Sequence, residues 1–243
     1  MSEHRSTKLF RDYVRIPTVQ PQPSYEPAVD LLVREAESVG LVAVTHECAP
    51  GKPVLILSWE GREPGLPSLL LNSHMDVVPV FPEYWTHPPF SAHKDEQGNI
   101  YGRGTQDMKS VGIQHLEAVR RLKESGKRPK RSIHLTFVPD EEIGGITGMK
   151  LFVKSDVFKN LNVGFGLDEG LASPDDEIPL YFGERNKFWI KITCRGSPGH
   201  GSRFLENTAG EKVWRVINRP QCPQSKSLLR PISFVYYNHP SFQ

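Results

Sequence analysis

The length, charge and cysteine content of the chain exclude several classes of protein. Its 243 residues are enough for one sizeable α/β domain and part of a second. With 30 basic and 28 acidic residues the net charge is +2, so no overall field attracts nucleic acid. The three cysteines, Cys48, Cys194 and Cys222, are widely spaced, which argues against a disulfide framework and a cysteine-based zinc site and fits a cytoplasmic protein.

Neither a signal peptide nor a membrane span is expected. The first residues, MSEHRSTKLFRDYVRI, are charged throughout and lack the apolar centre and small-residue cleavage site of a signal peptide. Nowhere in the sequence do about 18 apolar residues follow one another. The basic run at 120–131 is best interpreted as a solvated helix end and turn. The sequence therefore predicts neither a membrane nor a nucleic-acid partner.

The first third of the chain predicts two helices followed by two buried strands. Two groups of apolar residues repeat at helical spacing: Leu9, Phe10, Tyr13 and Val14, then Ala28, Leu31, Leu32 and Ala36. Short apolar runs follow at 53–58 and 68–72. They are bounded by Gly and Pro, as expected for strands that are buried on both faces.

The middle of the chain predicts one helix and two further strands. An apolar stripe from Met108 to Leu122 has helical spacing, and Asp107 comes directly before it. Residues 132–138 alternate between apolar and polar, and 163–167 (VGFGL) has a similar pattern. Strands that alternate with helices favour the α/β class, with a mainly parallel twisted sheet flanked by helices.

The last sixty residues differ from the rest in composition. The segment 187–196 (KFWIKITCRG) predicts a strand of another unit, followed by the loop SPGHGSRF and a helix in AGEKVWRVIN. From residue 219 the sequence is rich in proline and has no sustained period. We therefore predict a first domain at 1–184, part of an α+β second domain at 185–218 and a divergent, disordered tail at 219–243.

Acidic residues and a histidine follow the predicted strands. These residues are His74 and Asp76 after 68–72, Asp140, Glu141 and Glu142 after 132–138, and Asp168 and Glu169 after 163–167. In an open parallel sheet, ligands bind outside the carboxyl ends of the strands, so these groups and Asp107 are expected to lie together. Residues two apart in a strand point to the same side, and a metal-binding imidazole usually donates its other N–H to a carboxylate or carbonyl.

Several carboxylates in one cleft predict a divalent cation. They repel one another and raise each other's pKa values unless a positive charge offsets them. One imidazole with carboxylate oxygens suits zinc, and a carboxylate between two ions supports a pair about 3.5 to 4 Å apart. Manganese and cobalt suit the same donors.

Each of these groups has a simpler interpretation when it is taken alone. Asp107 is typical of a helix N-cap, 168–169 of a polar turn, 141–142 of a solvated loop, and 74–76 of a strand that ends in a loop. These interpretations are independent of one another. A metal site predicts all four groups together at strand ends, so the joint pattern favours the metal site.

Five motifs together resemble the co-catalytic zinc exopeptidase and deacylase family, which includes carboxypeptidase G, acetylornithine deacetylase and the aminoacylases. The motifs are SHMDVVP, YGRGTQDMK, PDEEIGG, LDEG and GSPGHGS, in the order of the family. The stretches LLNSHMDVVPVF and TFVPDEEIGG are most similar to the cytosolic zinc aminoacylases, which are N-acyl-L-amino-acid amidohydrolases. The similarity runs from about residue 8 to about residue 218.

The resemblance implies a set of metal ligands. His74, Asp107 and Glu169 would hold one zinc ion. Asp107 would bridge to a second zinc ion, which Glu142 also binds. The family uses two zinc ions per subunit, and the last histidine ligand of the family lies in a later motif that His239 does not match. The second site is therefore expected to be incomplete.

The resemblance also implies three catalytic roles and a reaction. Asp76 would hold the ring of His74, Glu141 would be the general base, and His200 would steady the tetrahedral oxyanion. The reaction would hydrolyse an N-acyl-L-amino acid to a carboxylate and a free amino acid. A zinc dipeptidase or carboxypeptidase of the same family is the first alternative to this function.

The second alternative is a catalytically impaired variant that acts only as an association partner. Members of the family are homodimeric and longer than this chain, which resembles a C-terminally truncated member with an altered end after Asn218. A second domain shortened in this way would weaken dimerisation.

Overall fold

The computed structural model describes residues 3–170, 177, 179–183 and 191–218. The chain divides into two compact units, Met1–Tyr181 and Phe182–Gln243, which are described separately. The predicted division at 184 and 218 remains a prediction, and the predicted tail, 219–243, lies outside the described residues.

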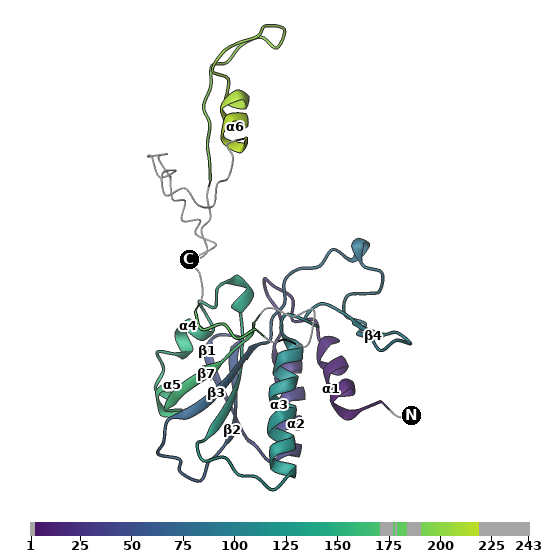
Figure 1. Ribbon diagram of the computed structural model, residues 1–243, viewed down its shortest axis with the longest axis vertical. Helices are drawn as coiled ribbons and strands as arrows, with labels where there is room; N and C mark the ends of the chain where they lie inside the picture. Colours follow the sequence, from purple (N-terminus) through teal and green to yellow (C-terminus); the bar gives the residue numbers. More distant parts are fainter. Residues whose placement is uncertain (1–2, 171–176, 178, 184–190, 219–243) are drawn as a thin grey trace. The chain divides into compact units, whose positions relative to one another are not determined.

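A five-stranded sheet forms the centre of the first unit (Figure 1). The strands lie in the order β1 (Val42–Ala49), β2 (Lys52–Trp59), β6 (Ile133–Val138), β3 (Ser68–His74) and β7 (Val163–Leu167). Strand β3 is parallel to β6 and β7, whereas β2 is antiparallel to both β1 and β6. The α/β class is confirmed.

The sheet is mixed because β2 runs antiparallel to the other four strands, and the connection between its first two strands is one reason. Only Pro50 and Gly51 separate β1 from β2, and Gly51 has a φ of 70°. So short a link joins antiparallel strands, because a parallel pair needs a crossover of a dozen or more residues. The charged residues predicted to form the site follow the parallel strands β6, β3 and β7.

Helices cover both faces of the sheet. One face carries α1 (Arg5–Val14), α2 (Glu26–Val39) and α3 (Lys109–Glu124), and the short helices α4 (Met149–Phe152) and α5 (Asp156–Asn160) lie on the other (Figure 1). Strand β2 is buried on both sides: Leu55 and Leu57 enter the larger core, and Val54 and Ile56 enter the smaller one. The strands and helices predicted for this unit are present, and strand β1 and the short helices α4 and α5 were not predicted.

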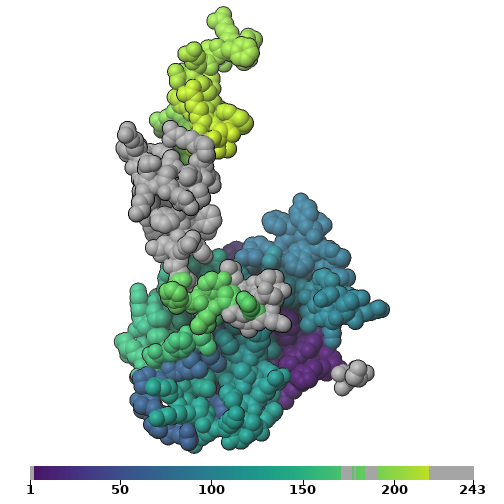
Figure 2. Space-filling model, in the orientation of Figure 1, coloured from purple at the N-terminus to yellow at the C-terminus, as the bar shows by residue number. Residues whose placement is uncertain are grey.

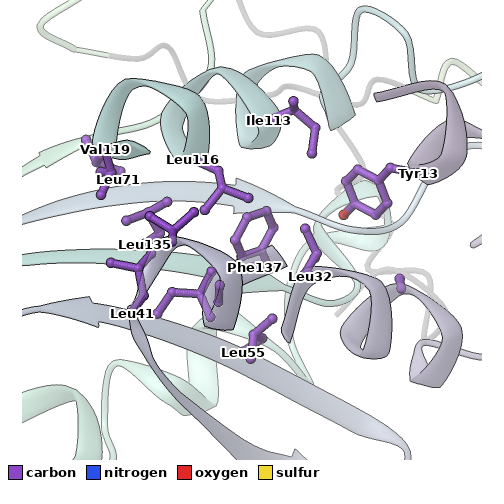
Figure 3. Close-up of a cluster of buried hydrophobic side chains, with 14 of the residues drawn as sticks. Tyr13, Leu32, Leu41, Leu55, Leu71, Ile113, Leu116, Val119, Leu135 and Phe137 are labelled. Carbon is purple, nitrogen blue, oxygen red and sulfur yellow. The ribbon is translucent and has the colours of Figure 1, made fainter. Parts of the chain in front are cut away.

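The larger core holds α3 against the centre of the sheet. Figure 3 shows Leu116 of this helix beside Leu135 and Phe137 of β6. At Gly112 the approach is so close that an added Cβ would lie 2.8 Å from Phe137 Cε1 and 2.9 Å from Ser73 Oγ. A glycine is therefore needed here, and the close packing brings the start of α3 to the end of β3.

Between β3 and α3 the chain forms a projecting arm. It contains a short 3₁₀ helix, η1 (Pro82–Tyr84), and the two-stranded hairpin of β4 (His93–Lys94) and β5 (Ile100–Tyr101). In Figures 1 and 2 this segment, drawn in blue, extends away from the rest of the first unit. In the described part of the chain no helix is long and apolar enough to span a bilayer.

The second unit has one helix in its described part, α6 (Ala209–Ile217), as the sequence predicts. The strand predicted at 187–196 is not formed over 191–196, and its first four residues lie outside the described range. A strand needs a partner for its backbone groups. Here the segment is bound to the region of the helix instead: Ser197 N donates to Asn207 O at 3.2 Å, and Lys212 Nζ donates to Arg195 O at 2.8 Å.

Candidate metal centre

The candidate ligands lie at the carboxyl ends of three neighbouring strands. His74 is the last residue of β3, and Glu169 follows β7 by two residues. Glu141 and Glu142 lie in η2 (Glu141–Ile143), a short 3₁₀ helix after β6. Because β6, β3 and β7 are parallel neighbours, their ends meet at one edge of the sheet.

These side chains converge on the ring of His74. Its Nε2 atom is 2.9 Å from Asp107 Oδ1, 3.7 Å from Glu169 Oε2 and 3.9 Å from Glu141 Oε2. Two sets each offer three ligand atoms within 4.8 Å of one another: His74 with Asp107 and Glu142, and His74 with Glu141 and Glu169. The structure thus brings together the four residues predicted as metal ligands and the predicted base.

Residue Asp76 orients the ring of His74 through its backbone. The Nδ1 atom of His74 is 2.8 Å from the carbonyl oxygen of Asp76 and 3.5 Å from its carboxylate Oδ1. The first distance is that of a good hydrogen bond, and the second is beyond the usual range. With Nδ1–H donating to this carbonyl, Nε2 faces the acidic residues, and the loss of its proton would give it the lone pair that metal-binding histidines use.

The carboxylate of Asp76 has a different set of partners. It accepts hydrogen bonds from the backbone N–H groups of Glu141 at 3.0 Å and Glu142 at 3.1 Å. It also accepts one from Gln20 Nε2 at 2.7 Å, and the Asp76 side chain is fully buried. Asp76 therefore fixes the loop that carries the predicted base and a predicted ligand.

A second buried carboxylate, that of Asp140, anchors the same loop at the residue directly before Glu141. Asp140 has a φ of 62° and is 1% exposed. Four side chains donate to it: Tyr25 at 2.8 Å, Gln20 at 3.0 Å and Lys52 at 2.9 Å on Oδ1, and Thr147 at 2.5 Å on Oδ2. The sequence carries no signal for these four partners, because none of them belongs to a motif and three come from distant segments.

The carboxylate of Asp107 faces the ring and does not cap α3. The helix starts at Lys109, and within the described residues the side chain of Met108 at the N-cap position makes no capping hydrogen bond. Asp107 instead accepts from His74, which lowers the pKa of its carboxyl group. The simpler interpretation of Asp107 as an N-cap is therefore wrong.

Polar side chains also tie the end of β7 to the central strands. Asn72 of β3 donates to Asp168 at 3.0 Å and accepts from the hydroxyl of Thr136 in β6 at 2.7 Å. The other oxygen of Asp168 accepts from the backbone N–H of Glu169 at 2.9 Å. This chain of hydrogen bonds holds Glu169 at the edge where His74 lies.

The site holds more negative than positive groups, and a divalent cation would offset this excess. Burial lowers the pKa of His74, but its interactions with Asp107, Asp76 and Glu169 outweigh burial and raise the pKa to about 12. Burial raises the pKa of Glu142 to about 7, and the charge of Asp107 adds to the effect. A bound metal replaces the proton of such groups and stabilises the carboxylates. The donor set therefore fits a divalent metal.

The remaining predicted site residue, His200, belongs to the second unit. It is exposed, and its Nδ1 lies 2.8 Å from Ser202 Oγ. Its role at the oxyanion remains a prediction. His239 lies outside the described residues.

Comparison with known sequences shows which proteins the chain is similar to. Residues 70–184 match the model of peptidase family M20/M25/M40. The chain is 56% identical to aminoacylase-1 of Mus musculus over 217 residues, which is 89% of this chain and 53% of that protein. It is 48% identical to aminoacylase-1 of Dictyostelium discoideum over 220 residues, 90% of this chain and 54% of that protein. The chain spans about half the length of the curated relatives it matches.

Solved structures show the same fold. A metallo-carboxypeptidase of the M20 family from Sulfolobus solfataricus matches with a TM-score of 0.60 at 22% identity, covering 70% of this chain and 38% of that one. Human carnosine dipeptidase 1 matches with a TM-score of 0.57 at 16% identity, covering 67% and 37%. The match to peptidase family M20/M25/M40 covers residues 70–184 of the chain. The predicted resemblance is confirmed, and in sequence the chain is a relative of the aminoacylase-1 proteins.

Proposed function

We propose that the protein is a zinc-dependent amidohydrolase that cleaves N-acyl-L-amino acids to a carboxylate and a free amino acid. The observation that carries this proposal is the convergence of one imidazole and several carboxylates at the strand ends, in a chain more than half identical to an aminoacylase-1. The likeness to dipeptidases and carboxypeptidases is at identities of 22% or less and concerns the fold. The acylated amino acid is therefore the better supported substrate class.

The metal would be held by the side chains around His74. As the family resemblance implies, we assign His74, Asp107 and Glu169 to one zinc ion, and Asp107 with Glu142 to a second, less complete position. By distance alone, the structure groups His74 with Asp107 and Glu142, and His74 with Glu141 and Glu169. When bound, zinc lowers the pKa of a coordinated water toward about 7 and so supplies a nucleophile at neutral pH. The carbonyl of Asp76 keeps the neutral ring of His74 in the orientation that such binding requires.

The proton transfers of the reaction fall to Glu141. Its carboxylate oxygen Oε2 is 3.9 Å from His74 Nε2, so it lies at the edge of the ligand cluster. A carboxylate there can take a proton from the attacking water and later deliver it to the departing amine. Its backbone N–H donates to the buried Asp76, which holds this residue in place.

Three further features belong to the proposal. We assign the tetrahedral oxyanion to His200, as the family resemblance implies, and the location to the cytoplasm. We also propose that copies of the chain associate only weakly, although the family is homodimeric.

A joint measurement of zinc content and substrate choice tests the proposed function. We expect the purified chain to bind zinc and to hydrolyse N-acetyl-methionine faster than simple dipeptides. Faster hydrolysis of dipeptides would contradict the substrate class while leaving the metal chemistry in place. A chain that binds zinc but hydrolyses nothing on the panel would contradict the assigned enzymatic activity.

A further inference from the structure

Gln20, which belongs to none of the recognised motifs, lies next to two buried carboxylates of the candidate metal centre. Gln20 is 4% exposed and belongs to the segment between α1 and α2. This segment runs beside the residues that follow β3: Gln20 N donates to Val77 O at 3.0 Å, and Val77 N donates to Thr18 O at 2.9 Å. The pairing places the side chain of Gln20 next to Asp76.

The carboxamide of Gln20 bridges two buried carboxylates. Its Nε2 atom is 2.7 Å from Asp76 Oδ2 and 3.0 Å from Asp140 Oδ1. An amide NH₂ group has two hydrogens, so it can donate one to each acid. The opposite orientation would place Oε1 against two negative charges. In the observed orientation Oε1 is buried without a hydrogen-bond partner among the described residues, which shows that both donors are retained while the acceptor is left unpaired.

The two acids that Gln20 joins flank the loop of the predicted base and ligand. Asp76 accepts from the N–H groups of Glu141 and Glu142, and Asp140 comes directly before them in the chain. A change in the separation of Asp76 and Asp140 would therefore tilt this loop. The direction of both glutamate side chains depends on that separation.

We propose that Gln20 is a positioning residue of the metal centre. By joining Asp76 to Asp140, it sets the direction in which Glu141 and Glu142 present their carboxylates to the ligand cluster. The inference rests on the metal binding in the proposed function and is independent of its substrate. Residues that hold the ligands of a metal site in place commonly lower its metal affinity when they are mutated.

A purely structural role is the competing explanation, and Thr18 provides the matched control. Its hydroxyl donates to Met75 O at 2.5 Å, and the residue is fully buried in the same segment. This hydrogen bond holds the segment to the chain after β3 without touching either carboxylate. If Gln20 only holds the segment in place, loss of either side chain should affect the metal equally.

The test compares Gln20→Met with Thr18→Val in the full chain. We would measure Zn²⁺ affinity by competition with a chromophoric chelator, the visible spectrum of the Co²⁺-loaded protein, and the midpoint of thermal unfolding. We expect Gln20→Met to lower Zn²⁺ affinity by about 10 to 100-fold and to change the Co²⁺ bands. Thr18→Val should leave both readouts close to wild type at a comparable loss of thermal stability.

Equal shifts in the two variants, or wild-type affinity in Gln20→Met, would overturn the role of Gln20. If Gln20→Met fails to fold, Gln20→Leu replaces it, because this change also removes the group that donates to both carboxylates. A loss of affinity greater than that of Thr18→Val then supports the proposal, and an equal or smaller loss overturns it. A wild-type chain that binds no Zn²⁺ overturns both this proposal and the proposed function. If the Gln20 variant binds Zn²⁺ more weakly than Thr18→Val but the wild-type chain hydrolyses no substrate, only the proposed function is overturned.

Discussion

The central strands and the edge strand of the sheet hold their ligands differently. Strands β3 and β6 each pair with a neighbour on both sides, whereas β7 pairs with β3 and with no other strand in the described residues. His74 at the end of β3 is 1% exposed, and the side chain of Glu169 beyond β7 is 34% exposed. The ring of His74 is therefore fixed by packing before a metal binds, whereas Glu141 after β6, with a side chain 44% exposed, is held through its backbone N–H.

Because of this difference, we expect the central and edge residues to contribute unequally to metal affinity. At the central ends, buried acids hold the loop of Glu141 and Glu142 through direct hydrogen bonds. At the edge, Asn72 donates to Asp168, whose other carboxylate oxygen accepts from the backbone N–H of Glu169. Preorganised ligands lose less conformational entropy on binding, so the central residues should contribute more to metal affinity.

The largest effect is expected for catalysis at the central side. Glu141→Gln keeps the size and backbone hydrogen bond of the residue but removes its ability to take a proton. Turnover of N-acetyl-methionine should fall by about 10² to 10⁴-fold, while zinc content and unfolding midpoint stay near wild type. Near-normal turnover would exclude Glu141 as the base.

Truncating one ligand from each region tests whether the central residues contribute more to metal affinity than the edge residue. We expect His74→Ala to lower zinc affinity by more than about 100-fold and Glu169→Ala by about 10-fold, since the first removes a preorganised ligand. Chelator competition on both proteins under the same conditions measures the difference. Equal losses would show that the edge ligand is as well fixed as the central one.

The pH dependence of metal binding should show which protons the metal displaces. The pKa of Glu142 is raised to about 7 and that of His74 to about 12, so both groups carry a proton below pH 7. Zinc affinity should therefore rise with pH, by about 100-fold per unit below pH 7 and about 10-fold per unit above it. Titrations from pH 5.5 to 8.5 measure these slopes.

A single slope across this range in the wild-type protein would contradict the assignment of the two protons. Glu142→Gln provides the control, because it removes one of the two titrating groups. We expect this variant to lose the steeper part of the profile and to retain the shallower slope.

The smallest effect is expected at the link between the two regions. Asn72→Leu removes the side chain that joins Thr136 to Asp168 and leaves their polar groups without this partner. Urea unfolding should show a loss of about 1 to 3 kcal/mol in stability. Zinc affinity should fall no further than in Glu169→Ala, and a loss as large as that of His74→Ala would contradict the expected ranking.

Burial alone does not explain which strands the sequence predicts, because β7 was predicted although its middle residues are exposed. Strand β7 has the predicted range, 163–167, and β3 and β6 lie within a few residues of theirs. Strand β1 was missed because it lies at an edge, where Val42 and Val44 are exposed and no clear alternation marks a buried face. The strand expected at 187–196 is not formed over its described part, 191–196, because in the described part of the second unit it has no partner to pair with.

The sequence by itself determined which chemical groups follow each strand. A strand that is buried on both faces has a local apolar pattern, and the residues after it, such as His74 and Glu141, are read directly from the chain. Only the tertiary structure decided how these groups face one another: the carbonyl of Asp76 holds the ring, its carboxylate holds the loop, and Gln20 joins it to Asp140. Such contacts connect residues that lie far apart in the chain, and the packing of α1, α2 and the sheet sets them, so no local pattern carries them.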